Sequence, residues 1–380
     1  MQPRHFNLLA LTAIISLIAA GVVHSAYNNF SDDEVTGDRL FPSLEDRAAK
    51  TGQIAIRKGE GQLTFKRSED GKVWSIVERS GYPIDATKVR KLVLQLAEAE
   101  LIERKTRNEK LYGQLGLGDP TEKDAKSKLV KIADAGGGTI AEVVVGNERH
   151  AAFGTGKSGT YVRVPGNDQT WLAKLDIDAS TDVADWVDPV FFKADKDKFA
   201  SLVVKQGDGV VYKLVPAEKK DGGFELADVP AGKKVKESVR IDDLVNGIRT
   251  LEMTDVRKAQ EADAKPDMTA EITMQDGAKY LVGMKEEDRK RWITVDVLDN
   301  GKDADAAKKF ADATKGWAFE IADWRAKQTF KPADELFETV KVEAPATSVT
   351  PQEQPIPRLG PRLSPQGKPP AVGPKVQEKN

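Results

Sequence analysis

The chain has 380 residues, which is enough for two ordinary domains, with a formal net charge of −2 and no cysteine. A nearly neutral chain lacks the broad basic field that nucleic acid binding needs. The absence of cysteine excludes disulfides, thiolate metal sites, cysteine nucleophiles and a lipid anchor on cysteine.

The first feature along the chain is an apolar run over residues 6–23 that carries no charge. In a helix a run of this length extends about 27 Å, close to the thickness of a membrane's hydrocarbon layer. Arg4 before the run and Asp32 and Asp33 after it favour an inside N-terminus and an outside body. We therefore expect residues 1–26 to be a single-pass anchor in a bacterial inner membrane, with the body in the periplasm. A cleaved signal peptide is the alternative, because His24-Ser25-Ala26 loosely resembles a cleavage site.

A first folded unit is predicted over residues 52–190, after a polar stretch at residues 27–51 that we interpret as a stalk. The unit opens with short apolar runs that are separated by glycine-containing turns, a pattern typical of an antiparallel meander. These runs lie at residues 54–56, 63–66 and 73–77.

The periodicity changes at Asp85, and the next stretch predicts an amphipathic helix that lies with one face on a sheet. Its apolar face consists of Val89, Leu92, Val93, Leu96 and Ala97. Its polar face carries Lys88, Arg90, Lys91, Gln95 and Glu98. A short helical piece is expected around residues 109–115, followed by β-hairpins at 129–145 and 160–173.

Residues 191–340 repeat this order of features. The face Ile241, Leu244, Val245 and Ile248 corresponds to Val89, Leu92, Val93 and Leu96, and Asp323-Trp324 ends the second unit as Asp185-Trp186 ends the first. We infer an α+β fold of two tandem, divergent repeats, each with an antiparallel meander, an amphipathic helix and further hairpins. Chance recurrence of common strand and helix patterns is the alternative to a duplication.

The last segment, residues 341–380, contains 9 of the chain's 19 prolines and no aromatic residue. Such a composition buries too little apolar surface to offset chain entropy, so we expect a disordered tail. We interpret it as a solvated tail. The alternatives are a tether and a segment that interacts with another molecule.

Motifs that carry chemistry are weak. Gly156-Lys157-Ser158 resembles the end of a phosphate-binding loop, but Ala151 stands where the motif needs glycine and a strand is predicted to follow, so we expect a hairpin turn. His150 is the only histidine in the body, which leaves little for a serine triad or a histidine-based zinc site. We assign no catalytic, cofactor-binding or metal-binding residue and expect no cofactor.

The six tryptophans are expected mainly to fill the core between sheet and helix. Trp186 and Trp324, each preceded by an aspartate (Asp185 and Asp323), are the candidates for a binding or interdomain role. The two aspartates are also the only repeated candidates for the facing pair of carboxyl groups that glycoside cleavage needs, and no spacing in the sequence shows such a pair.

Three runs carry a family resemblance: GYPIDATKVRKLVLQLAEAELIERKT, LYGQLGL and GTYVRVPGNDQTWLA. They resemble the bacterial family of domain of unknown function 4340 (DUF4340), most clearly over residues 81–186. The resemblance implies an N-terminally anchored protein, commonly encoded beside ABC transporters of the gliding-motility type, and it implies no catalytic residues. The proline-rich tail lies outside the family pattern.

Together these features predict a noncatalytic, membrane-anchored extracytoplasmic accessory or binding protein, associated with ABC transporter subunits or other envelope proteins. Two alternatives remain open. One is a cell-envelope hydrolase that uses carboxylates, and the other is a ligand-binding module in the cleft between the two repeats.

Overall fold

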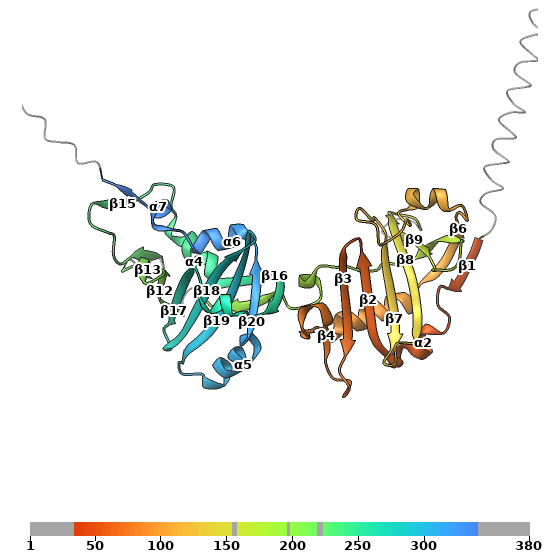
Figure 1. Cartoon of the computed structure of the whole chain (residues 1–380), viewed down its shortest axis with the longest axis horizontal. Coiled ribbons are helices and arrows are strands. Elements are labelled where there is room, and N and C mark those ends of the chain that lie inside the picture. Colours follow the sequence, from red (N-terminus) through yellow and green to blue (C-terminus); the bar gives the residue numbers. More distant parts are fainter. Residues whose placement is uncertain (1–33, 154–157, 196–197, 219–222, 341–380) are drawn as a thin grey trace, which may run out of the picture. The chain divides into compact units, whose positions relative to one another are not determined.

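The computed structural model describes residues 34–340 except for 154–157, 196–197 and 219–222. This part of the chain is an α+β fold with two large antiparallel sheets (Figure 1). The predicted anchor at residues 1–26 and the predicted tail at 341–380 lie outside the described residues. Among the residues that are described, no helix is long and apolar enough to cross a membrane.

The first sheet has ten strands in the order β1-β6-β10-β9-β8-β7-β2-β3-β4-β5. The strands are β1 (Glu34–Arg39), β2 (Thr51–Lys58), β3 (Gly61–Arg67), β4 (Trp74–Ile76), β5 (Tyr82–Ile84), β6 (Glu100–Arg104), β7 (Lys128–Asp134), β8 (Thr139–Arg149), β9 (Gly159–Arg163) and β10 (Thr170–Lys174). The helices are α2 (Leu44–Arg47) and α3 (Ala86–Ala97), with short 3-10 segments η1 (Ala48–Lys50), η2 (Val77–Arg79), η3 (Glu109–Leu115) and η4 (Val183–Asp185).

The second sheet has nine strands in the order β11-β16-β20-β19-β18-β17-β12-β13-β14. The strands are β11 (Val190–Lys193), β12 (Phe199–Gln206), β13 (Gly209–Pro216), β14 (Phe224–Leu226), β16 (Thr250–Lys258), β17 (Met268–Met274), β18 (Ala278–Glu287), β19 (Lys290–Asn300) and β20 (Trp317–Ile321). A separate pair consists of β15 (Lys233–Val235) and β21 (Phe337–Thr339). The helical segments are α4 (Ile241–Arg249), α5 (Ala304–Thr314), α6 (Asp323–Thr329), α7 (Ala333–Leu336) and η6 (Glu261–Ala264).

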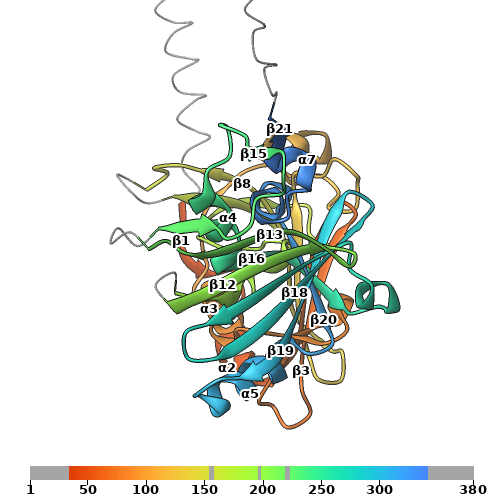
Figure 2. The same cartoon turned by 90° about the vertical axis from the view of Figure 1, so that its left-hand side faces the viewer.

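The two sheets place their strands in matching order. Across the first sheet from β1 to β4 there are nine strands, and each corresponds to one strand of the second sheet from β11 to β14. Corresponding strands take the same place in the sheet and follow the same order along the chain. Figure 2 shows β18, β19 and β20 side by side in the second sheet, the places that β8, β9 and β10 take in the first. Two antiparallel sheets of this kind are consistent with the predicted tandem repeats.

The predicted helix is confirmed in detail. Asp85 is the N-cap of α3, and its carboxylate accepts a hydrogen bond from the Thr87 amide at 2.8 Å, which satisfies one free donor of the first turn. The buried residues of α3 are the five predicted ones: Val89, Leu92, Val93, Leu96 and Ala97. They pack into the main core beside the strand residues Ile54, Ile56 and Phe65.

The turn and loop predictions can be checked in part. Gly156 and Lys157 lie outside the described residues, but β9 begins at Gly159, so the expected strand follows the motif. At the corresponding place in the second sheet, Asp288 and Arg289 have φ values of 49° and 65° and form the turn between β18 and β19. The His150 side chain is 85% exposed in the turn that follows β8.

The predicted boundary between stalk and body is wrong. β1 pairs antiparallel with β6, with Arg39 opposite Glu100, and the Leu44 side chain of α2 is fully buried. The folded body therefore includes residues 34–51 and does not begin at residue 52. The sequence conceals this because β1 is an edge strand that ends in exposed polar residues, so it lacks an alternating apolar pattern.

Replacing Leu44 by alanine should lower the free energy of unfolding by about 2–5 kcal/mol, because it empties a site in the core. The measurement is urea denaturation of the full chain in detergent. Leu298→Ala removes a leucine that is 53% exposed and should change the free energy by less than about 0.5 kcal/mol. Equal losses in the two variants would contradict the inclusion of residues 34–51 in the folded body.

Candidate functional site

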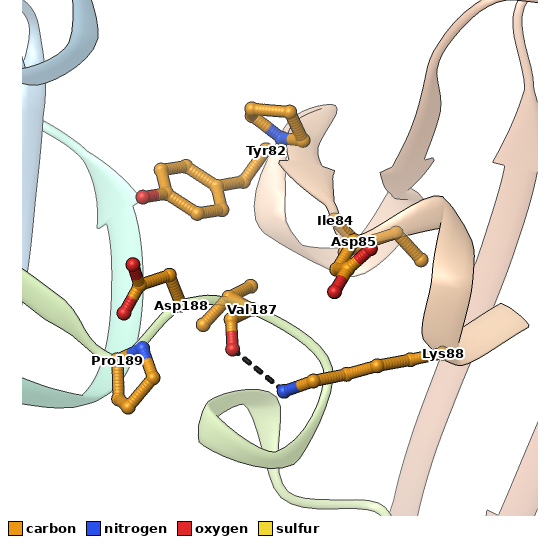
Figure 3. Close-up of a pocket in the computed structure, with 8 residues that line it drawn as sticks. Tyr82, Ile84, Asp85, Lys88, Val187, Asp188 and Pro189 are labelled. Atoms are coloured by element: carbon orange, nitrogen blue, oxygen red, sulfur yellow. Dashed lines mark hydrogen bonds between the residues drawn. The ribbon is translucent and has the colours of Figure 1, made fainter.

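An open hollow of about 570 Å³ lies beside the N-terminus of α3. It is lined by residues 82–85 and Lys88 on one side and by residues 187–189, which follow Trp186, on the other (Figure 3). The Asp85 amide donates to the Trp186 carbonyl at 3.1 Å. The Lys88 ammonium reaches across and donates to the Val187 carbonyl at 2.8 Å, so both walls are tied together.

Two ionisable groups of the hollow, Asp85 and Tyr82, have shifted pKa values. Hydrogen bonds from the amide and the side chain of Thr87 hold the pKa of Asp85 below its usual range, so this carboxylate is ionised. Asp188 accepts a hydrogen bond from the Val190 amide at 3.1 Å. Burial raises the pKa of Tyr82 to about 12, with the Asp188 carboxylate acting in the same direction, so the phenol is neutral. The hollow thus offers two carboxylates, one phenol and one ammonium.

Contacts beside the hollow join the first sheet to the second. The Tyr82 ring lies edge-on to Trp317, with ring centroids 4.9 Å apart. The Arg79 guanidinium donates two hydrogen bonds to the Asp255 carboxylate, at 2.6 Å and 2.9 Å, a bidentate pair. The strand β5, which carries Tyr82, is therefore held by contacts to the second sheet as well as by pairing within the first sheet.

The chemistry of these groups suits recognition better than proton transfer. A general acid or base works best with a pKa near the operating pH. Here the Asp85 pKa is lowered and the Tyr82 pKa is raised, so both shifts move away from neutrality. The Lys88 ammonium already donates to a carbonyl. A ligand with a cationic or hydrogen-bond-donating group would find two carboxylates beside an aromatic ring.

The family described as "Domain of unknown function (DUF4340)" matches residues 74–269, just over half of the chain. The chain belongs to the DUF4340 family. The matched region begins at β4 of the first sheet and ends in β17 of the second, so it includes both amphipathic helices and every residue that lines the hollow. No curated protein and no solved structure matches the chain.

In this DUF4340 protein the four residues singled out from the sequence do not line the hollow. Trp186 is 3% exposed, its indole N–H donates to the Ser180 carbonyl at 2.9 Å, and its ring centroid lies 4.5 Å from that of Phe65. Asp185 beside it is exposed. Trp186 therefore belongs to the core, and its backbone carbonyl alone supports the wall of the hollow.

Trp324 and Asp323 have other surroundings. The Trp324 side chain is 58% exposed on α6, with the Arg325 guanidinium 4.4 Å from the ring centroid. Asp323 pairs with Lys327 at 2.6 Å and with Arg291 at 3.2 Å. The hydrogen bond from Lys327 is the main cause that lowers the Asp323 pKa. Trp186 and Trp324 correspond in the sequence, but the first is buried in the core and the second is exposed on the surface.

Sequence reasoning missed most residues of the hollow. Asp85 was singled out only as the point where the helical period begins, and Lys88 only as part of the polar face. The Asp188-Pro189 pair was the available signal, because Asp-Pro favours the start of a turn. An Asp-Pro pair predicts a change of chain direction, but it does not predict which distant side chains face the turn.

Trp186→Ala should lower the free energy of unfolding by about 3–5 kcal/mol, because it removes a packed aromatic ring. Trp324→Ala should change it by less than about 0.5 kcal/mol, because that ring is exposed. Denaturant unfolding of both variants makes the comparison. A large loss at Trp324 would show that its ring is buried in the folded protein.

Tyr82 should ionise near pH 12, about two units above an ordinary tyrosine. Folding raises this pKa, so the neutral phenol contributes stability fully below about pH 10 and loses that contribution as the pH rises from about 10 to about 12. Phenolate absorbance is measured after rapid pH jumps for the full chain and for Tyr82→Phe. The difference between the two titration curves gives the ionisation of Tyr82. A difference that develops around pH 10 would contradict its burial.

Proposed function

We propose that this DUF4340 protein is a noncatalytic, membrane-anchored extracytoplasmic accessory protein that binds a protein partner of an ABC-type transport system. The observation that carries the proposal is the hollow at α3, whose charged groups are hydrogen-bonded and suited to recognition. The apolar run at residues 6–23 supports an anchor in the inner membrane, which would hold the body in the periplasm.

A duplication is part of this proposal. The matching strand orders and the matching places of α3 and α4, each leading directly into a strand at the same sheet position, support descent from one repeated unit. The inserted helix α5 and the pair of β15 with β21 would then be later additions to the second repeat. A single ancestral unit would have been self-sufficient as an antiparallel sheet with one covering helix.

The surroundings of Asp323 favour binding over hydrolysis by carboxylates. A glycosidase acid must be protonated to donate its proton, which usually requires a raised pKa. Lys327 and Arg291 instead hold the Asp323 pKa below its usual range. An exposed, ion-paired carboxylate of this kind is a poor general acid.

Ligand capture in the hollow is a second candidate function, favoured by the two carboxylates beside the Tyr82 ring. Thermal-shift measurements with cationic probes, namely short lysine peptides and glucosamine, would test it. Binding should raise the melting temperature of the full chain but not that of Asp188→Asn. Asp178→Asn, at an exposed aspartate outside the hollow, is the matched control. No shift with either class of probe would count against capture of cationic ligands.

The accessory role predicts that the full chain, cross-linked in its native host and purified from the membrane, carries transporter subunits with it. A different protein of the same host with one N-terminal anchor, expressed at equal level, is the control. Asp185→Ala and Asp323→Ala should leave the host phenotype unchanged, because neither carboxylate is proposed to do chemistry. Absence of any membrane partner, or loss of phenotype in a folded aspartate variant, would contradict the proposal.

A further inference from the structure

A groove of about 640 Å³ runs along one flank of α3, at the edge of the face that packs on the sheet. The segment after β1, namely η1 and the residues beside it, forms the opposite wall. Most of its surface is apolar. The residues that provide this surface are Ala48, Trp74, Val89, Val93, Leu94 and Ala97.

Leu94 marks the groove as a contact surface. Its side chain is 55% exposed, although it lies one helical turn from the charged Arg90 and Lys91 on the polar side of α3. A single exposed leucine is ordinary on a protein surface. This one lies beside Trp74, Val93 and Ala97, which are buried at the edge of the core, so Leu94 is the large exposed hydrophobic side chain of the groove.

The rim of the groove is positively charged. Arg67, Arg90 and Lys91 line it, with Glu45 as the carboxylate among the lining residues. Within the described part of the chain, none of the three cations forms an ion pair with a carboxylate, whereas Arg291 and Arg257 in the second sheet each pair with acidic groups. The Arg67 guanidinium donates a hydrogen bond to the Gly71 carbonyl at 2.9 Å, which does not neutralise its charge.

A buried hydroxyl adds a polar feature. Thr51, at the start of β2, lines the groove and is 4% exposed. Its Oγ1 has no hydrogen-bond partner among the described residues. A buried hydroxyl without a partner costs free energy, and the great majority of such groups in proteins are paired. The hydroxyl itself is buried, so it lies beneath the groove surface and not on it.

We propose that this groove docks an acidic amphipathic helix of a protein partner. Apolar side chains at helical spacing would cover Leu94 and Trp74, and flanking carboxylates would pair with Arg67, Arg90 and Lys91. The groove follows α3 from Thr87 to Ala97, which corresponds to about 15 Å or about three helical turns. The inference deepens the accessory role and rests on it, because it supplies the chemistry of the partner.

The chain's own tail is a poor occupant. Residues 341–380 carry more lysine and arginine than aspartate and glutamate. Like charges on the tail and on the rim would repel each other. Charge complementarity therefore points to an acidic segment from another protein.

A photoreactive benzoylphenylalanine in place of Leu94, in the full chain and in the native host, tests the occupant. We expect a protein adduct that is absent when the same group replaces Leu298, which has nearly equal exposure. Mass spectrometry should map the adduct to a segment rich in Asp, Glu and apolar residues. A lipid adduct, a basic segment, or no adduct above the Leu298 level would overturn the proposal.

A synthetic peptide of the captured segment, labelled with fluorescein, then measures affinity for the full chain in detergent. Leu94→Glu and the double variant Arg90→Glu/Lys91→Glu should each weaken binding about tenfold or more. Lys308→Glu/Lys309→Glu reverses two neighbouring exposed lysines on α5 and should change affinity less than about twofold. Equal affinity in the groove variants and the control would overturn the proposal.

The two proposals fail separately. If Leu94→Glu still carries transporter subunits through purification from the host membrane, the accessory role stands and the groove is not the docking site. If the full chain itself carries no membrane partner, the accessory role fails.

Discussion

The burial of one helix face on an antiparallel sheet is the constraint on which the rest of the structure depends. The five apolar residues of α3 cover the core side of the first sheet, and α4 does the same with Leu244, Val245 and Ile248 in the second. An antiparallel sheet needs such a cover on one face, because its apolar side chains otherwise face water. Once α3 is fixed in this way, its N-terminus, its polar side and its flank have fixed places as well.

The proposed binding surfaces both depend on that fixed helix. Its first turn, capped by Asp85, forms one wall of the hollow, and Lys88 ties this wall to the segment after Trp186. Its flank forms the groove at Leu94. Neither surface requires a residue with a pKa tuned to neutral pH. Both present charge beside apolar or aromatic surface, a combination that proteins use to recognise partners.

Prediction from the sequence succeeded where one segment carries its own period and failed where a neighbour decides. The helix at residues 86–97 is strongly periodic, and its buried face was identified without error. β1 was missed because an edge strand with exposed polar residues has no alternating pattern. α5 was missed because, of its eleven residues, only Ala307 and Thr314 are buried, so its apolar signal is faint.

By itself the sequence determined the local elements, the α+β class and membership of the DUF4340 family, because periodicity, turn residues and family motifs are properties of short stretches. Only the tertiary structure decided which member of a matched pair is buried. Trp186 packs on Phe65, which lies 121 positions earlier in the chain, whereas Trp324 on α6 remains exposed. The tertiary structure also decided that residues 82–88 lie against residues 187–189 and that the Leu94 side chain is exposed. Such facts depend on contacts between distant segments, which no local pattern encodes.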